Sequence, residues 1–152
     1  MRTASLLIRN VLVAVDGSEN SNRALDFALD LTEKYEAKIT VLNVSEDLAI
    51  SEVPHESTAY ATVGTAIFAK DLRRMHEEIL KKSVDHAKAV KPNLEVSSLL
   101  KEGDPALEIV NVAKDGGFDV IVVGHKGMGK VKELLLGSIS EKVAHLAPCL
   151  VV

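Results

Sequence analysis

Short runs of apolar residues alternate along the chain with longer segments in which apolar residues recur every three or four positions. The short runs occupy residues 11–15, 39–44, 94–100, 120–123 and 150–152. Runs that are apolar nearly throughout, without regular alternation of apolar and polar residues, are typical of strands buried on both faces of a sheet. The pattern therefore predicts five buried strands.

The longer segments predict four helices, at residues 19–35, 65–90, 105–115 and 137–146. Ser18 and Asp104 precede the first and third helices and are expected to cap them, and Pro105 suits a first helical position. Residues 45–64 show no clear period and contain Pro54, which favours a loop or lid. The stripes expected to face the core comprise Ala24, Ala28, Leu31 and Tyr35 on the first helix, and Leu72, Met75, Ile79, Ser83, Ala87 and Val90 on the second.

Strands that alternate with helices predict an α/β fold, in which helices cover both faces of a parallel sheet. No repeat or linker interrupts the order, so residues 1–152 are expected to form a single domain. In open sheets of this kind, ligands bind at the carboxyl ends of the strands, where the winding direction reverses. The fold alone therefore predicts a site near Asp16 and Gly124, which follow the first and fourth strands.

Composition narrows the classes of function. The formal net charge of −4 argues against a general binder of nucleic acid or of anionic membranes. A single cysteine, Cys149, rules out an intrachain disulfide and fits a cytoplasmic location. No apolar run approaches the length of a membrane span.

Glycines are concentrated after the fourth predicted strand, in the pattern G-x2-G-x9-G-S. The pattern begins at Gly124 and Gly127 and closes at Gly137 and Ser138, where the last helix is expected to start. A strand, a glycine-rich loop and a helix start together suit a phosphate, because the backbone approaches closely and helix N–H groups face the anion. The pattern is neither a P-loop nor a dinucleotide fingerprint. The alternative is that these glycines serve only turns and a helix start.

The chain resembles universal stress proteins of the ATP-binding subgroup. The resemblance rests on residues 11–18, on the glycine pattern and on residues 148–152. It implies an open five-stranded parallel sheet of order 3-2-1-4-5, Rossmann-like and similar to adenine nucleotide alpha hydrolases. It also implies ATP binding and a homodimer formed through the C-terminal strand.

The resemblance assigns roles to individual residues. Asp16 is expected to accept a hydrogen bond from the adenine amino group, although Asp-Gly is also a common turn former. Glycines 124 and 127 are expected to close on the ribose and first phosphates, and amides from residue 137 onward to bind the outer phosphates. The pocket wall and its backbone contacts are expected from Ala14, Val15 and Val44. The full set of expected site residues is Ala14, Val15, Asp16, Val44, Val123, Gly124, His125, Lys126, Gly127, Gly137, Ser138 and Ile139.

Basic groups gather in or beside this loop, at His125, Lys126, Lys130 and Lys132, and together favour a polyanionic ligand. Lys130 and Lys132 are expected to be solvated surface residues, whereas His125 and Lys126, which lie between two close glycines, are the expected ligand contacts. No residue stands out as a catalytic base, and no spacing of His, Cys or carboxylates predicts a metal site. Mg²⁺ or Mn²⁺ is therefore expected to be held mainly by the phosphates, and any hydrolysis to be slow. Three functions stay open: a nucleotide-dependent regulatory or stress-response protein, a slow ATPase or nucleotide-transferring enzyme, and a nucleotide-free dimerisation module.

Overall fold

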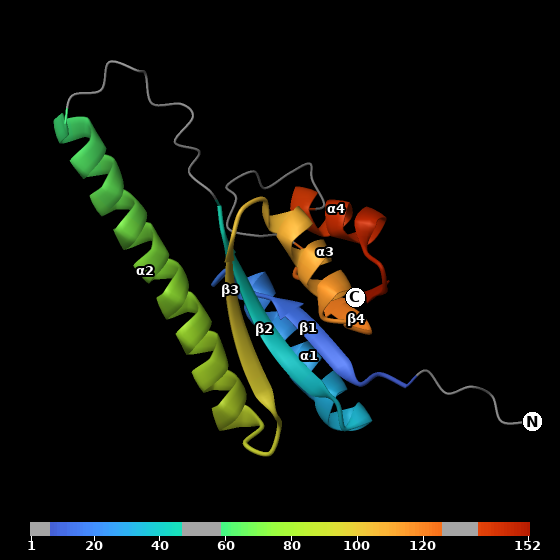
Figure 1. Cartoon of the computed structure of the whole chain (residues 1–152). Helices are drawn as coiled ribbons and strands as arrows, with labels where there is room; N and C mark the ends of the chain where they lie inside the picture. The colour runs from blue at the N-terminus through green and yellow to red at the C-terminus, as the bar shows by residue number, and fades with distance from the viewer. Residues whose placement is uncertain (1–6, 47–58, 126–136) are drawn as a thin grey trace, which may run out of the picture.

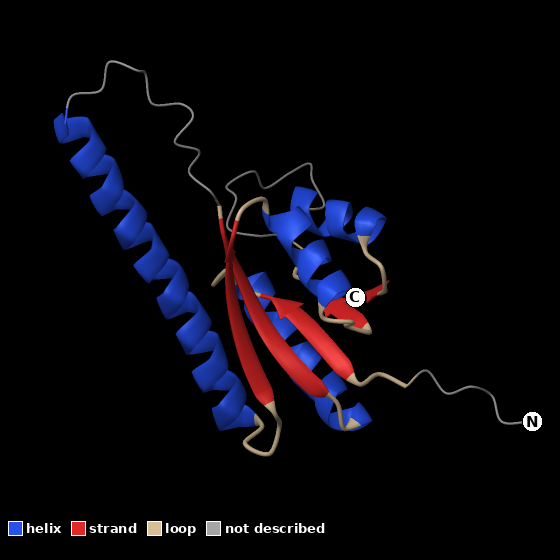
Figure 2. Cartoon of the chain, in the orientation of Figure 1, coloured by secondary structure: helices blue, strands red, loops and turns tan. Residues whose placement is uncertain are grey.

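The structure of the chain, a computed structural model, describes residues 7–46, 59–125 and 137–152. Five parallel strands form one sheet in the order β3-β2-β1-β4-β5, as predicted, and helices cover both faces (Figures 1 and 2). None of the described helices is both long and apolar enough to cross a membrane. The elements in chain order are β1 (Asn10–Ala14), α1 (Glu19–Tyr35), β2 (Lys38–Ser45), α2 (Ala59–Val90), β3 (Val96–Glu102), α3 (Pro105–Asp115), β4 (Val120–Val122), α4 (Ser138–Leu146) and β5 (Leu150–Val151).

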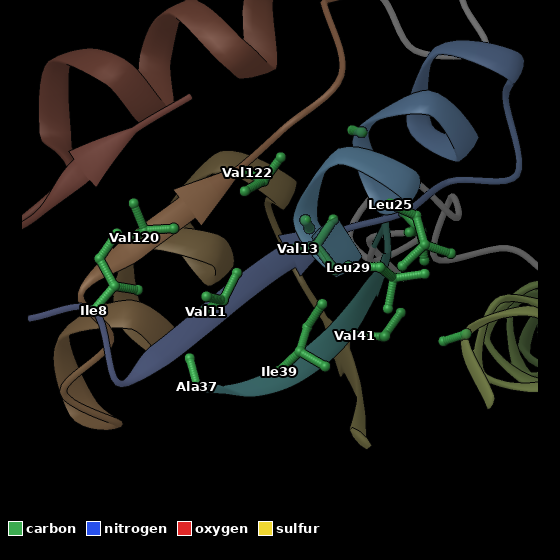
Figure 3. Close-up of a cluster of buried hydrophobic side chains, with 14 of the residues drawn as sticks. Ile8, Val11, Val13, Leu25, Leu29, Ala37, Ile39, Val41, Val120 and Val122 are labelled. Atoms are coloured by element: carbon green, nitrogen blue, oxygen red, sulfur yellow. The ribbon is translucent and has the colours of Figure 1, made fainter. Parts of the chain in front are cut away.

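One face of the sheet packs against α1 and α2. Alternate residues of the central strands point to this face, among them Val11 and Val13 of β1 and Val41 of β2 (Figure 3). They meet Leu25 and Leu29 of α1, and all five side chains are almost fully buried. This layer is built from aliphatic side chains, as expected of a chain with few aromatic residues.

The opposite face packs against α3 and α4. Here the intervening strand residues Leu12, Leu42 and Ile121 contact Ile109 of α3 and Val143 of α4. Because neighbouring residues of a strand point to opposite faces, strands buried on both sides have the unbroken apolar runs seen in the sequence. The prediction of a two-faced parallel sheet is confirmed.

The helix ends follow the expected chemistry. The Ser18 hydroxyl accepts a hydrogen bond of 3.1 Å from the amide of Ser21 and caps α1. Asp104 caps α3 by accepting from the amide of Leu107 at 3.0 Å, and Pro105 is the first residue of that helix. Both predicted caps are confirmed.

Two predicted helix faces were partly wrong. Tyr35 is exposed, and Thr32 takes the buried position on α1, where its hydroxyl donates to the Ala28 carbonyl at 2.6 Å. On α2, Met75 and Val90 are 57% and 49% exposed. Ser83 and Ala87 are buried as predicted, and Leu80, which was not predicted, is buried with them where the helix runs beside β2 and β3.

The long helix also begins earlier than predicted. It starts at Ala59 and not at residue 65, so the last part of the predicted loop or lid is helical. The rest of that segment, residues 47–58, lies outside the described residues. Figure 1 shows the N-terminal end of α2 well beyond the sheet, where Val63, Ile67 and Phe68 are all more than half exposed. The apolar period is obscured here because this half of the helix has no sheet to cover.

The third strand is also shifted, to Val96–Glu102 from the predicted 94–100.

Candidate functional site at the strand ends

The winding of the chain reverses at β1, which pairs with β2 on one side and with β4 on the other. Val13 of β1 pairs with Val122 of β4, so the residues that follow both strands leave the sheet side by side. Those residues are Asp16 with its turn on one side and Gly124 with its loop on the other. The fold thus brings the two predicted parts of the site to one edge of the sheet, the edge at which such folds bind ligands.

Asp16 organises the turn between β1 and α1. One of its carboxylate oxygens accepts from the amide of Ser18 at 2.9 Å, while its own amide donates to the Ser21 hydroxyl at 3.3 Å. Gly17 adopts the left-handed φ of +82° that glycine tolerates best. The interpretation of Asp16 as a turn former is confirmed. Its role as an acceptor for adenine stays a prediction.

An apolar surface lies beside this turn, on the α3 and α4 side of the sheet. Ala14, Val44 and Val123 are partly buried side chains at the ends of β1, β2 and β4 that pack against that layer. The side chain of Val15 points the other way and is buried in the α1 and α2 layer. The expected pocket wall can therefore include Ala14 and Val44 but not the Val15 side chain, because adjacent strand residues face opposite layers.

Gly124 lies against the first turn of α1. A Cβ at this position would be 3.0 Å from the carbonyl carbon of Asn20 and 3.1 Å from the nitrogen of Ser21. Because those neighbours are backbone atoms that cannot easily move, any side chain would press α1 away from the sheet edge. This packing requirement was not part of the sequence prediction. The expected contact of Gly124 with a ribose is a separate prediction that the packing leaves untested.

Gly137, at the start of α4, is joined to His125 across the segment 126–136. Its amide donates to the His125 carbonyl at 2.9 Å, and the Ser140 hydroxyl donates to the Gly137 carbonyl at 2.8 Å. The Gly137 amide thus has a partner within the protein, contrary to the expectation that it faces a phosphate. Ser140 was not predicted. The sequence feature that could have identified Ser140 is its position three residues after the helix N-cap. From that position a short hydroxyl side chain reaches back to the cap residue.

Ser138 and Ile139 are the first two residues of α4, and both side chains are exposed. Their amides belong to the first helical turn, which lacks carbonyl acceptors within the helix. Among the described residues, no side chain caps this N-terminus, whereas Ser18 and Asp104 cap α1 and α3. The positive end of the α4 dipole and its outward N–H groups suit an anion.

Of the remaining predicted residues of the loop, the structure describes only some. His125 is exposed at the end of β4. Lys126 and Gly127 lie outside the described residues, as do Lys130 and Lys132.

A shallow hollow adjoins the loop on the β5 side. Its walls come from the end of β4, from α4 and from β5, and comprise Val123, His125, Ser140, Glu141, Ala144, Val151 and Val152. A second hollow lies between α2 and β3, away from the strand ends. The charged side chains of the second hollow pair with one another, Arg73 with Glu77 at 3.2 Å and Lys81 with Asp85 at 2.8 Å. Only the first hollow therefore belongs with the candidate site.

A polar chain that the sequence analysis missed runs from the end of β1 to α2. The Asn43 side-chain amide donates to the Val15 carbonyl at 2.7 Å, and its oxygen lies 2.6 Å from Nδ1 of His76. Asn43 is the polar member of the strand row that faces α2, two residues beyond Val41. An asparagine within a buried apolar run was the available signal.

A metal site built from side chains is not evident in the described segments. No three His, Cys, Asp or Glu residues of these segments lie close enough together to hold a metal ion. The expectation that the phosphates hold most of a divalent cation stays a prediction.

Comparison with known proteins agrees with this architecture. The model of the universal stress protein family matches residues 7–152. Universal stress protein YxiE of Bacillus subtilis (strain 168) is 32% identical over 145 residues, which cover 94% of this chain and 96% of the relative. A universal stress protein of Methanothermobacter thermautotrophicus is 35% identical over 147 residues, with 94% and 92% of the two chains covered.

Solved structures show the same fold. Universal stress protein UspA from Lactobacillus plantarum superposes with a TM-score of 0.80 at 23% identity, over 95% of this chain and 96% of that one. A universal stress protein solved in complex with cAMP superposes with a TM-score of 0.70 at 25% identity, over 96% of both chains. The chain belongs to the universal stress protein family.

Proposed function

We propose that this protein binds an adenine nucleotide, with ATP as the expected ligand, and that it acts as a nucleotide-dependent regulatory protein in the stress response, with little turnover. The observation that carries this proposal is the joint placement of two features at one sheet edge. One is the apolar surface of Ala14, Val44 and Val123. The other is the α4 N-terminus, which no side chain of the described segments caps and which is hydrogen-bonded to His125, just beyond β4.

The two features match the two ends of a nucleotide. An apolar surface suits the faces of a purine base, whereas a helix N-terminus with exposed amides suits phosphates. A universal stress protein that shares 25% of its sequence with this chain has been solved with cAMP, which supports an adenine ligand for the present site. Asp16 lies beside the apolar surface and can accept a further hydrogen bond, because a carboxylate offers several lone pairs.

Magnesium or manganese is expected to accompany ATP as part of the nucleotide complex. The described residues offer a hydroxyl at Ser138 but no cluster of carboxylates, so the phosphates would supply most of the ligands. This is the coordination that Mg²⁺ commonly adopts with nucleotides.

Slow ATP hydrolysis is the second candidate. It is favoured by one observation, that His125 and Glu141 line the same hollow beside the start of α4. Either group could accept a proton from an attacking water if that water lay within hydrogen-bond reach of the group and beside a bound phosphate. Turnover is therefore measured together with binding.

The first experiment identifies the ligand. Purified protein is denatured, the released small molecules are identified by mass, and ATP, ADP, AMP and cAMP are titrated calorimetrically with Mg²⁺ present. Co-purified ATP, or calorimetric ATP binding without conversion, supports the regulatory proposal, and accumulation of ADP or AMP supports an enzyme. A protein that carries and binds no adenine nucleotide would overturn both.

A pair of variants at Ser138 then tests the phosphate contact. Ser138→Pro removes the first helical amide at a position where proline is tolerated, and Gly137 already has the ψ of 122° that a following proline requires. Ser138→Ala removes only the hydroxyl. Because a hydrogen bond to a charged group contributes about 1.5–3 kcal/mol, Ser138→Pro should weaken ATP binding by about ten- to a hundredfold, and more than Ser138→Ala does. Unchanged affinity of Ser138→Pro would place the phosphates elsewhere.

We further propose that the chain acts as one domain in the cytoplasm and forms a homodimer through β5. This strand lies at the end of the sheet, and Leu150 beside its open edge is 50% exposed. Unpaired edges of this kind are ready to pair with another chain. Leu150→Asp should shift the protein toward monomer in sedimentation velocity, whereas Leu107→Asp, at a comparably exposed leucine on α3, should not. A dimer that survives Leu150→Asp would exclude this interface.

A further inference from the structure

We propose that Asn43 and His76 are positioning residues for the nucleotide site, which fix the carboxyl end of β1 and couple it to α2. This inference rests on the proposed nucleotide binding and adds a helix that the sequence analysis did not connect with the site. It is carried by three contacts, which are Asn43 with Val15, Asn43 with His76, and Ile79 with Gly17.

The first contact holds Val15 just beyond the end of β1. The strand itself ends at Ala14, which pairs with Leu42 of β2. One residue further, the Val15 amide donates to the Leu42 carbonyl at 2.8 Å, and the Val15 carbonyl accepts from the Asn43 side chain at 2.7 Å. Both backbone groups of Val15 are thus held from β2. The Asn43 side chain extends the fixed part of β1 to the residue before Asp16.

The second contact satisfies the oxygen of the Asn43 amide, whose orientation is set by the first contact. A backbone carbonyl only accepts, so the NH₂ group of Asn43 must face Val15 and its oxygen must face His76. Nδ1 of His76, 2.6 Å away, therefore carries the hydrogen. With the opposite amide orientation, two oxygens would face each other at Val15. The Val15 carbonyl thus fixes the orientation of Asn43, and His76 stabilises that orientation by donating to the amide oxygen.

The burial of Asn43 makes these two bonds important. Its side chain is only 1% exposed and lies in a row with Ile39 and Val41, inside the apolar layer under α1 and α2. A buried amide that loses a hydrogen-bond partner is destabilised far more than an exposed one. Removal of the His76 donor should therefore release or displace Asn43, and with it the Val15 carbonyl.

The third contact reaches the same turn independently. A Cβ placed on Gly17 would lie 3.3 Å from Cγ1 of Ile79, which shows that the Ile79 side chain packs directly over this glycine. Ile79 follows His76 by three residues and so shares a face of α2 with it. The helix thus contacts the turn of Asp16 at Gly17 directly and at Val15 through Asn43.

A coupling between α2 and the nucleotide follows from this arrangement. Asp16 lies between Val15 and Gly17, the two residues that α2 holds. A nucleotide that contacts Asp16 or the backbone of Val15 favours the fixed arrangement of the turn, which in turn favours the docked position of α2. Such coupling is reciprocal, so a change that loosens this part of α2 should weaken nucleotide binding, by at most the coupling free energy.

The test compares calorimetric ATP affinities of the whole protein and of matched variants. His76→Leu removes the donor, and His76→Asn returns an amide nitrogen to about the place of Nδ1. His86→Leu is the control, because His86 also lies on α2 and its Nε2 contacts Oδ1 of Asp26 at 2.7 Å, but on the α1 side. We expect a loss of affinity of about fivefold or more for His76→Leu, near wild-type affinity for His76→Asn, and no change for His86→Leu.

Hydrogen exchange gives a readout that a merely structural role would not change. ATP should slow the exchange of amides around residues 72–80 in the wild type and in His76→Asn. It should not do so in His76→Leu, although the protein is folded. Should His76→Leu fail to fold, His76→Ser tests the same bond, because its side chain is too short to reach Asn43 and the half-buried position admits water.

The outcomes separate this inference from the function on which it rests. A wild type that binds no adenine nucleotide would overturn both. A wild type that binds ATP, together with His76 variants of equal affinity, would overturn the inference alone. An equal loss in His86→Leu would also overturn it, because the effect would then be a general loosening of α2.

Discussion

The amide of Gly137 donates to the carbonyl of His125 at 2.9 Å, and a Cβ on Gly137 would lie 2.7 Å from that same oxygen. Real Cβ atoms essentially never come this close to another heavy atom, so a side chain here requires a shift of the backbone. Glycine at the start of α4 therefore permits a close junction between His125, three residues beyond the end of β4, and the helix proposed to bind phosphates.

Gly137→Ala should accordingly lower both stability and nucleotide affinity. Overpacking against backbone costs about 1–3 kcal/mol, which urea unfolding will measure, and displacement of α4 should weaken ATP binding in calorimetry. Gly64→Ala is the matched control, because nothing lies within 4 Å of a Cβ at this exposed position of α2. Alanine is the better helix former, by about 0.5–1 kcal/mol, so Gly64→Ala should increase helicity or stability and leave affinity unchanged. A stable Gly137→Ala variant with normal affinity would contradict the close junction.

Asp119 joins the beginning of β4 to the chain entering β1. Its Oδ2 accepts from the amides of Arg9 and Asn10, at 2.8 Å and 2.9 Å. Asp119→Ala leaves both amides without this acceptor and should lower the free energy of unfolding by about 1.5–3 kcal/mol. Asp119→Asn retains an acceptor oxygen and should cost less. Urea unfolding compares the two variants, and equal losses would show that the side-chain oxygen is not what stabilises this junction.

The cap of α3 should make stability depend on pH in the acidic range. The hydrogen bond from the Leu107 amide, with the nearby charge of Lys142, lowers the pKa of Asp104 below its ordinary value of 3.8. A pKa lowered by folding contributes stability that is present above the unfolded pKa and is lost as pH falls through the folded value. At pH 6, Asp104→Ala should cost about 1 kcal/mol.

Thermal unfolding of wild type and Asp104→Ala from pH 6 to pH 2 measures this dependence. The difference between the two proteins should shrink below about pH 4, as the carboxylate is protonated. Asp115→Ala, at the other end of α3, provides the control. A difference that stays constant to pH 2 would mean that the charge of Asp104 does not contribute.

Cys149 should react slowly in the folded protein. Partial burial, with a smaller effect from the charge of Asp119, raises the pKa of this thiol above its ordinary value of 9.0. Since the thiolate is the reactive form, alkylation at pH 7.5 should be slow until the protein is unfolded with guanidinium. The pH profile of the folded protein should have its midpoint above 9.0, and rapid reaction at neutral pH would contradict the shift.

The sequence was a good guide to the fold because its strands are buried on both faces. Continuous apolar runs such as Val120–Val122 identify such strands directly, and the caps at Ser18 and Asp104 mark where helices begin. Periodicity failed where burial is incomplete. The N-terminal half of α2 has no sheet beneath it, so its start could not be read from a core-facing stripe. Met75 lies beside the sheet but points to solvent, which its apolar character does not reveal.

The site was less predictable, because several of its contacts join residues distant in sequence. Gly124 and Asn20 approach each other only after β4 has paired with β1, so the sequence gives no reason to connect them. The Asn43–His76 bond depends likewise on how α2 crosses β2. The opposite directions of Ala14 and Val15 follow from strand geometry alone and could have been foreseen.

The central position of β1 has a consequence for biosynthesis. Its β2 partner emerges from the ribosome soon after it, whereas β4 and α4 come from the last part of the chain. Until then the edge of β1 that will pair with β4 is open, and Leu12 and Leu42 are not yet fully covered by α3 and α4. An open strand edge beside uncovered leucines is a hazard for pairing between nascent chains. This protein should therefore depend most on chaperones while its ribosome-bound chain has not yet been synthesised as far as Val120.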